Sequence, residues 1–426
     1  MDYAQAIEFL HRLQIFGARP GLASTRRLAS LVGNPQEGLQ FLHVAGTNGK
    51  GSTCAMLESI CRAAGLKVGL FTSPHLVSFR ERIQINRRLI EEKDVAALVG
   101  ELRPHLEREF SSADHPTFFE VVTIMALLFF SRRHVDVVIW ETGLGGRLDA
   151  TNIVTPLVSV ITNVQLDHEQ WLGSTRAAIA AEKAGIIKPG IPVVTSAGDR
   201  EALEVIVETA RRNDAPLTVI GATHAEAVGS AVSLPLAGGH QRLNAALALA
   251  AVDAAGSKLL VSEESCWRGL REVQWAGRFQ EVRRGSRVLV LDGAHNPAGI
   301  QALREVLGER FPGVKPCFIF AAMKDKDWAA MASGLGDLVG RVLLCRIGTE
   351  RSAQPEELVG AFRGVLGDGA AVEICGSLAE ALARSEDCPL TVITGSLYFV
   401  GEACQALGIS AGADERGLNE WGSASK

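Results

Sequence analysis

Short apolar runs rich in Val, Ile and Leu alternate along the chain with longer segments in which apolar residues recur every three or four positions. The runs have the length of buried strands, and the longer segments have the period of amphipathic helices. Strands that alternate with helices predict a parallel sheet covered on both faces. The first series of predicted strands comprises FLHVAG, KVGLFTS, VDVVIWE, PLVSVITNV, IPVVTS and PLTVIG.

A second series of apolar runs begins close to Glu281 and comprises RVLVLD, CFIFAA, RVLLCRI and PLTVITG. It contains no glycine-rich loop of the kind that interrupts the first series. We therefore predict an α/β fold with two domains, a parallel-sheet domain over residues 1–280 and a smaller Rossmann-like domain over residues 281–410. The polar, Gly- and Ser-rich residues 411–426 are expected to form a flexible tail.

A glycine-rich loop, HVAGTNGKGST at residues 43–53, lies where the first predicted strand meets a predicted helix. Free backbone N–H groups and the helix dipole at such a turn favour a phosphate site over a plain glycine turn. The spacing is unusual for a phosphate loop, because Gly51 separates Lys50 from the hydroxyl residue Ser52. If the loop is functional, other groups that suit a nucleotide or a metal should lie near it.

Polar side chains follow three other predicted strands of the first series: Ser73, Glu141 and His168. Ligands in open α/β sheets collect at the carboxyl ends of the strands, so these side chains are expected to lie near the glycine loop. Oxygen and nitrogen donors of this kind suit Mg²⁺ that is held jointly by protein and phosphates. Taken singly, a strand-end Glu or His is more often a helix cap or a surface group, and Ser73 before a proline is most simply a turn.

Two further segments carry candidate chemistry. Lys183 stands in the small, apolar segment AAEKAGIIKPG, where a lysine ordinarily extends to water. In a poorly solvated site beside a metal, the amine of Lys183 would more easily be neutral. A neutral amine can react with carbon dioxide to form an anionic carbamate. The segment ETGLGGRLDATN, with Arg147 and Asp149, is either a flexible connector or a loop that binds a substrate.

Composition excludes several classes of protein. The 426 residues carry a net charge of −5, and the basic runs RERIQINRR and EVRRGSR are short or mixed, so we expect solvated surface there and no nucleic-acid partner. The eight cysteines include no C-x-x-C pair and are expected to be buried thiols. An acidic N-terminus and apolar runs too short for a membrane span indicate a reduced, cytoplasmic protein without a membrane partner.

Several motifs, taken in order, resemble the folylpolyglutamate synthase and dihydrofolate synthase family of the Mur ligase superfamily. The motifs are HVAGTNGKGST, TSPHL with FRERIQIN, TFFE, ETGLGGRLDATN, LDHEQWLG, EKAGIIK, GRFQ, LDGAHNP and TGSLYFVGE. The resemblance as a whole runs from about residue 10 to about residue 402. This family spaces its phosphate loop as G-T-N-G-K-G-[ST], so the resemblance accounts for Gly51.

The resemblance implies a P-loop ATPase domain followed by the smaller α/β domain. It also implies an ATP-dependent carboxylate–amine ligase of folate biosynthesis and one-carbon metabolism. Such an enzyme phosphorylates a carboxylate of dihydropteroate or of a folate, and the amine of L-glutamate then displaces the phosphate. The expected cofactors are ATP and Mg²⁺, the expected partners are small-molecule substrates alone, and the chain is expected to be a monomer.

The resemblance assigns roles to individual residues as well. The catalytic residues would be Lys50, Glu141, His168 and Lys183, and the metal ligands would be Ser73, Glu141, His168 and a carboxylated Lys183. The ATP-binding residues would be Thr47, Asn48, Gly49, Lys50, Gly51, Ser52, Asn244, Arg278 and Asp292. The pterin-binding residues would be Thr117, Phe118, Phe119, Glu120, Leu148, Asp149 and Ala150, although both phenylalanines also suit core packing. His295 and Asn296 would either line the cleft between the domains or begin a helix.

Three other functions fit part of the pattern. A cell-wall precursor ligase of the same superfamily would share the phosphate loop, Glu141, His168 and Lys183, but should lack TFFE and GLGGRLDATN in this arrangement. An ATP-hydrolysing switch or motor should carry a lysine followed directly by Ser or Thr. A non-catalytic binding module would not need an intact Lys50 together with Glu141, His168 and Lys183. Arg87, where the family often has glycine, leaves the choice between dihydropteroate and folates open.

Overall fold

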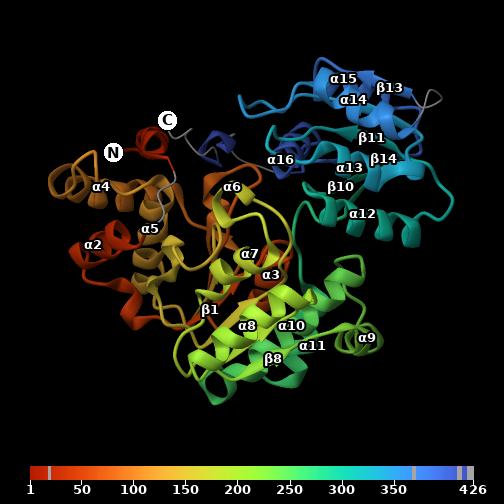
Figure 1. Ribbon diagram of the computed structural model, residues 1–426. Coiled ribbons are helices and arrows are strands. Elements are labelled where there is room, and N and C mark those ends of the chain that lie inside the picture. Colours follow the sequence, from red (N-terminus) through yellow and green to blue (C-terminus); the bar gives the residue numbers. More distant parts are fainter. Residues whose placement is uncertain (18–20, 367–370, 410–414, 420–426) are drawn as a thin grey trace.

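Two β-sheets organise the chain. The computed structural model describes residues 1–17, 21–366, 371–409 and 415–419. Figure 1 shows two lobes, with the second, in blue, above the first. Apolar clusters lie on both faces of each sheet, as expected for strands that are buried on both sides. The predicted α/β architecture with two domains is therefore confirmed.

The first sheet has eight strands in the order β4-β3-β2-β5-β1-β6-β7-β8. Its strands are β1 (Phe41–Ala45), β2 (Val68–Phe71), β3 (Ile83–Ile85), β4 (Arg88–Leu89), β5 (Val137–Glu141), β6 (Val158–Ile161), β7 (Val193–Thr195) and β8 (Leu217–Val219). The six strands predicted from apolar runs are parallel, and β3 and β4 add an antiparallel hairpin at one edge. That hairpin lies in the run RERIQINRR, and the expectation of a solvated face is wrong at Arg82 and Ile83, which are buried.

The second sheet has six strands in the order β13-β12-β11-β14-β10-β9. Its strands are β9 (Gln280–Arg284), β10 (Arg287–Leu291), β11 (Cys317–Phe320), β12 (Arg341–Leu344), β13 (Ala371–Ile374) and β14 (Leu390–Thr394). All neighbouring strands are parallel except β9, which pairs antiparallel with β10. The sequence pattern predicted four of these strands and missed the edge strands β9 and β13, whose side chains are largely half-buried or exposed.

Helices connect the strands of both sheets. The first domain contains α1 (Tyr3–Arg12), α2 (Ala23–Leu31), α3 (Lys50–Ala63), α4 (Glu92–Glu109), α5 (Phe118–Arg132), α6 (Glu169–Leu172), α7 (Arg176–Ala184), α8 (Arg200–Arg212), α9 (Ala222–Ala231), α10 (Gly239–Ala255) and α11 (Glu263–Glu272). The second contains α12 (Pro297–Arg310), α13 (Trp328–Leu335), α14 (Pro355–Leu366), α15 (Leu378–Arg384) and α16 (Leu397–Ala406). Short 3₁₀ helices are η1 (Leu13–Phe16), η2 (Pro35–Gly38), η3 (Phe79–Arg82), η4 (Ala150–Ile153), η5 (Gly256–Lys258), η6 (Gly336–Leu338) and η7 (Arg416–Asn419).

The central position of β1 sets the location of the site. β1 lies between β5 and β6, with Val44 opposite Glu141 and Ala45 opposite Ile161. All three strands are parallel, so the loops that follow them emerge at the same edge of the sheet. The apolar helix α5 is buried almost throughout in the core of the first domain. None of the helices in the described ranges is long and apolar enough to cross a membrane.

Residues 415–419 pack against the first domain. Glu415 is only 5% exposed, and its carboxylate accepts hydrogen bonds from Tyr3 Oη and from Phe79 N, both at 2.7 Å. The prediction of a flexible tail is wrong for this segment, because a buried carboxylate with several donors ties it to the domain surface. The other residues of the predicted tail, from 411 onwards, lie outside the described part of the chain.

Replacing Glu415 with alanine is expected to destabilise the first domain by about 2–4 kcal/mol, because buried donors on Tyr3, Ser78 and Phe79 would lose their acceptor. Differential scanning calorimetry should show a lower transition temperature for this domain. Glu386→Ala, at an exposed glutamate of the second domain, is the matched control. Equal transitions for the two variants would contradict a stabilising role for Glu415.

Candidate active site

The glycine-rich loop after β1 is held open as a cradle. Gly46 and Gly49 have φ of +152° and +84°, and a Cβ on Gly46 would lie 1.8 Å from Thr162 Oγ1. Thr47 N and Asn48 N donate hydrogen bonds of 2.9 Å to the carbonyl and side-chain oxygens of Asn163, in the loop after β6. Glycine is therefore required at these positions, and the cradle is braced by the neighbouring strand end.

Gly51 has a packing role in addition. A Cβ on Gly51 would lie 3.0 Å from Trp275 Nε1, in the segment that leads to the second domain. The next residue, Ser52, is buried and its hydroxyl accepts a hydrogen bond of 3.3 Å from Gln241 Nε2 of α10. The extra glycine therefore lets the interdomain segment pack closely against the start of α3, beside the contact that Ser52 makes with α10.

Two lysines share one carbonyl oxygen of the cradle. Lys50 Nζ and Lys183 Nζ donate to Gly46 O at 3.1 Å and 2.9 Å. Lys183, near the end of α7, is 3% exposed. Burial, followed by the charge of Lys50, lowers the pKa of Lys183 to about 7. Its amine is thus neutral in a substantial fraction of molecules near physiological pH.

Ser73 and Glu141 lie together beyond β2 and β5. Ser73 N donates a hydrogen bond of 3.1 Å to Glu141 Oε2, and no hydrogen bond to Glu141 Oε1 occurs within the described residues. Burial raises the pKa of Glu141 to about 7, even though Lys50 opposes the shift. A buried carboxylate with one unpaired oxygen is well suited to bind a cation.

His168 caps α6 in a left-handed conformation, with φ of +53°. Its side chain is 41% exposed, but it faces a cleft rather than open solvent. Withdrawal from bulk water lowers the pKa of His168 to about 4; Asp167 opposes this shift, and Lys326 adds to it. The imidazole is therefore neutral at physiological pH, which is the form that binds metals.

The structure brings the predicted nucleotide and metal residues together around one cavity of about 320 Å³. These residues are Thr47, Asn48, Gly49, Lys50, Gly51, Ser52, Ser73, Glu141, His168, Lys183, Asn244, Arg278 and Asp292. Arg278 and Asp292 come from the junction with the second domain and from the end of β10. The cavity therefore lies between the two domains, with the glycine cradle on one side.

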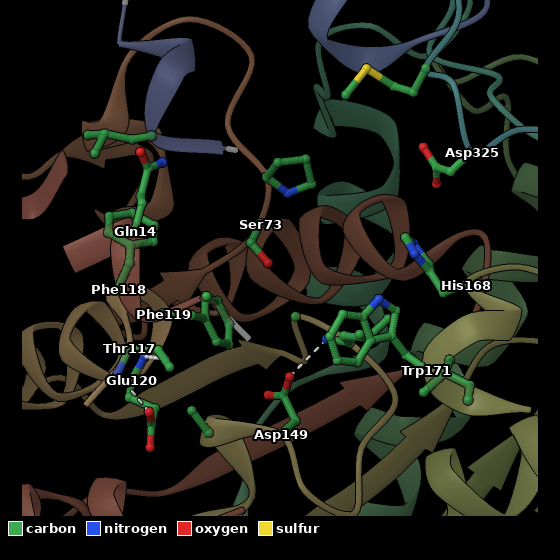
Figure 2. Close-up of a pocket in the computed structure, with 18 of the residues that line it drawn as sticks. Gln14, Ser73, Thr117, Phe118, Phe119, Glu120, Asp149, His168, Trp171 and Asp325 are labelled. Carbon is green, nitrogen blue, oxygen red and sulfur yellow. Dashed lines mark hydrogen bonds between the residues drawn. The ribbon is translucent and has the colours of Figure 1, made fainter. Parts of the chain in front are cut away.

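A second cavity, of about 490 Å³, contains the predicted substrate residues (Figure 2). Thr117, Phe118, Phe119, Glu120, Leu148, Asp149 and Ala150 all line it. Ser73, His168 and His295 line both cavities. The two cavities therefore meet at the predicted metal ligands.

Several of these substrate-side residues shape the cavity wall. Thr117 N donates to Glu120 Oε2 at 2.8 Å, which closes a capping box at the start of α5. Phe118 is buried and packs in the core, whereas Phe119 is half-buried with its ring 5.9 Å from that of Phe71. Core packing thus describes Phe118, and Phe119 retains surface that faces the cavity.

The glycine loop after Glu141 is not a flexible connector. Asp149 is buried and accepts hydrogen bonds from Leu144 N at 2.8 Å and Thr151 N at 3.0 Å. Arg147 forms an ion pair of 2.7 Å with Glu182 of α7. These contacts fold the loop into a fixed wall of the substrate cavity.

Comparison with known proteins assigns the family. Residues 44–252 match the Mur ligase middle domain, and residues 277–396 match the Mur ligase glutamate ligase domain. The dihydrofolate synthase/folylpolyglutamate synthase of Bacillus subtilis is 36% identical over 423 residues, which cover 94% of this chain and 98% of that protein. The chain belongs to the folylpolyglutamate synthase family of Mur ligases.

Other relatives agree. A probable bifunctional folylpolyglutamate synthase/dihydropteroate synthase of Haloferax volcanii is 39% identical over 95% of this chain, which spans only 50% of that protein. The Mycobacterium tuberculosis folylpolyglutamate synthase complexed with ADP superposes with a TM-score of 0.88 at 28% identity, over 96% of this chain and all of that one. Escherichia coli FolC in complex with DHPP and ADP gives 0.84 at 31% identity, over 96% and 98% of the two chains. This family member is an ATP-dependent ligase.

The sequence pattern missed Asp167, which joins the two domains of the ligase. Asp167 is 8% exposed and accepts hydrogen bonds from Lys326 Nζ at 2.7 Å and Asn296 Nδ2 at 3.1 Å. Burial alone would raise the pKa of Asp167, but His295, His168 and Lys326 outweigh it and hold the pKa below its usual range. The motif LDHE contains this aspartate, but nothing in a single sequence reveals its partners in the second domain.

Asn296 begins a helix, as one of its two predicted roles requires, and also contacts the glycine cradle. Its side chain caps α12 by accepting a hydrogen bond of 2.8 Å from Gly299 N. The same amide exchanges hydrogen bonds of 3.1 Å and 3.2 Å with the amide of Asn48 in the glycine cradle. One residue of the second domain is thus tied to the cradle of the first domain.

Proposed function

We propose that the ligase joins L-glutamate to dihydropteroate, to a reduced folate, or to both, in a reaction driven by ATP. An oxygen of the substrate carboxylate attacks the γ-phosphorus of ATP, and ADP leaves with the bridging oxygen. The nitrogen of glutamate then attacks the acyl carbon, phosphate leaves, and the amine loses a proton. The observation that carries this proposal is the meeting of the nucleotide cavity and the substrate cavity at Ser73 and His168.

In this proposal the cradle residues hold the ATP phosphates. Gly49, Gly51 and Ser52 supply backbone N–H groups, and Lys50 adds a positive charge within the loop. Thr47 and Asn48, whose N–H groups bond to Asn163, shape the cradle around the phosphates. Asn244, Arg278 and Asp292 would contact the rest of the nucleotide. Asp292 is fixed for this role by hydrogen bonds of 2.8 Å from Phe279 N and 2.9 Å from Ala294 N.

The donor set at the junction fits Mg²⁺. Ser73, Glu141 and His168 supply one hydroxyl, one carboxylate and one neutral imidazole, and Glu141 keeps an oxygen without a hydrogen-bond donor. The described ranges contain no cluster of three or more His, Cys, Asp or Glu side chains suited to a metal. This supports an ion shared with phosphate and water instead of one caged by protein alone. When bound, Mg²⁺ neutralises the negative charge that develops during phosphoryl transfer.

Lys183 is proposed to act as its carbamate. The neutral amine attacks carbon dioxide, a nitrogen–carbon bond forms, and one proton leaves, so that a buried cation becomes an anion. Its low pKa and its position beside Lys50 and the cradle support this conversion. The anion would then help to hold the metal and the reacting carboxylate.

The two domains are proposed to close on the substrates and exclude water from the acyl phosphate. The hydrogen bonds of Asp167 and Asn296 across the cleft support such closure. Because one chain lines both cavities, we propose a monomer. All eight cysteines are free, and six of them are buried, which supports a reducing compartment such as the cytoplasm.

The decisive experiment supplies purified protein with MgATP, L-glutamate and either dihydropteroate or tetrahydrofolate. Phosphate release and a product heavier by one glutamyl residue are expected with at least one acceptor. Reactions without acceptor or without glutamate are the controls. If neither acceptor gave an ATP-dependent product, the proposed function would be refuted.

A further inference from the structure

One large aromatic side chain in the substrate cavity has no structural explanation. Trp171 is 46% exposed, although tryptophan is usually well covered in folded proteins. Its indole N–H has no hydrogen-bond acceptor, and its ring stacks on no other aromatic ring, within the described residues. A free aromatic face inside a cavity is suited to contact a ligand.

The backbone holds Trp171 firmly next to the predicted metal ligand. Trp171 N and Leu172 N donate to His168 O at 2.9 Å and 3.1 Å, which closes the single turn of α6. Leu172 is buried against Gly145, where an added Cβ would lie 3.0 Å from Leu172 Cδ2. The position of Trp171 relative to His168 is therefore set before any substrate binds.

Trp171 and Phe119 line the same cavity and come from opposite sides of the glycine loop that contains Asp149. Figure 2 shows both rings flanking Asp149, with Ser73 above them. Phe119 already packs on Phe71 with one part of its ring, whereas Trp171 keeps its face for the cavity. The part of the cavity beside Trp171 therefore suits a planar group whose carboxylate points to Ser73 and His168.

The two acceptors differ in the distance between the aminobenzoyl ring and the reacting carboxylate. In dihydropteroate, the reacting carboxylate is bonded directly to the aminobenzoyl ring. In a folate, an amide and three aliphatic carbons lie between that ring and the reacting γ-carboxylate. When the reacting carboxylate lies at the metal ligands, the aminobenzoyl ring of dihydropteroate lies beside Trp171, one helical turn from His168. The aminobenzoyl ring of a folate lies farther from Trp171.

We propose that Trp171 is a specificity-determining residue that contacts the aminobenzoyl ring of dihydropteroate and not that of a folate. This assignment rests on the proposed ligase function. Trp171 therefore selects for the first addition of glutamate, to dihydropteroate, over later additions to folates. Phe119 is assigned to the pterin by the resemblance and is not part of this contact.

The test compares steady-state kinetics of Trp171→Ala with both acceptors. Loss of the ring contact is expected to raise KM for dihydropteroate by roughly tenfold or more. KM for tetrahydrofolate and KM for ATP should stay close to their wild-type values. Trp171→Phe should restore most of the affinity for dihydropteroate, because it keeps an aromatic face.

Trp267→Phe, at a half-buried tryptophan of α11 whose indole bonds to Glu263, is the matched control and should change neither KM. Equal losses with both acceptors would show a structural role for Trp171 and overturn the assignment, and so would an unchanged KM for dihydropteroate. Calorimetric binding of dihydropteroate to wild type and Trp171→Ala checks the contact without turnover. A wild-type enzyme that extends tetrahydrofolate but neither binds nor uses dihydropteroate would refute this assignment alone, whereas inactivity with both acceptors would refute the ligase function.

Discussion

Lys50→Ala is expected to lower kcat by about a thousandfold, because a preorganised charge on the transferring phosphoryl group would be lost. Lys50 lies at the first position of α3, and its Nζ contacts the carbonyl oxygens of Gly46 and Thr47 at 3.1 Å and 3.2 Å. The ammonium is therefore held at the cradle without supporting the core. Phosphate release from ATP in the presence of both other substrates measures the effect.

The fold of Lys50→Ala should remain intact, with a circular dichroism spectrum and thermal transition like those of the wild type. Lys93→Ala, at a lysine of α4 that is 76% exposed, is the control for loss of a surface charge. Near wild-type turnover by a folded Lys50→Ala protein would show that the glycine loop does not serve phosphoryl transfer.

Lys183→Ala is expected to lower kcat by about a hundredfold or more, since an anion that orders the metal site would be missing. A small carboxylic acid such as acetate or formate should restore part of the activity by entering the vacated space. Lys188→Ala, at a half-buried lysine farther along the same segment, is the control and should not respond to added acid. Substantial activity of Lys183→Ala without added acid would contradict the carbamate.

When carbon dioxide is limiting, the activity of the wild-type enzyme should depend on pH in the way that the titration of Lys183 predicts. Only the neutral amine adds carbon dioxide, and the neutral fraction of Lys183 grows as pH rises through its pKa of about 7. Activity should therefore rise from pH 6 to pH 8, about one unit either side of that pKa, and added bicarbonate should flatten the rise. Mass spectrometry of the intact protein at alkaline pH offers a direct check for the carbamate.

The location of the chemistry was largely predictable from local pattern. Apolar runs of strand length mark β1, β5 and β6, and the glycine cradle, Glu141 and His168 lie at or after their carboxyl ends. Because parallel strands present these ends at one edge, Glu141 and His168 had to approach the glycine cradle once the order of the strands was set. The edge strands β9 and β13 escaped prediction because half-exposed strands carry little apolar signal.

The sequence by itself determined the alternation of strands and helices, the glycine cradle and the residue types at the strand ends, since each depends on neighbours close along the chain. Only the tertiary structure decided that Asp167 meets Lys326, that Glu415 is buried beside Tyr3, and that Trp171 faces the substrate cavity. Each of these contacts or surfaces depends on how distant segments come together in space. Periodicity along one sequence records which face of an element is buried, but it does not record the partner that covers that face.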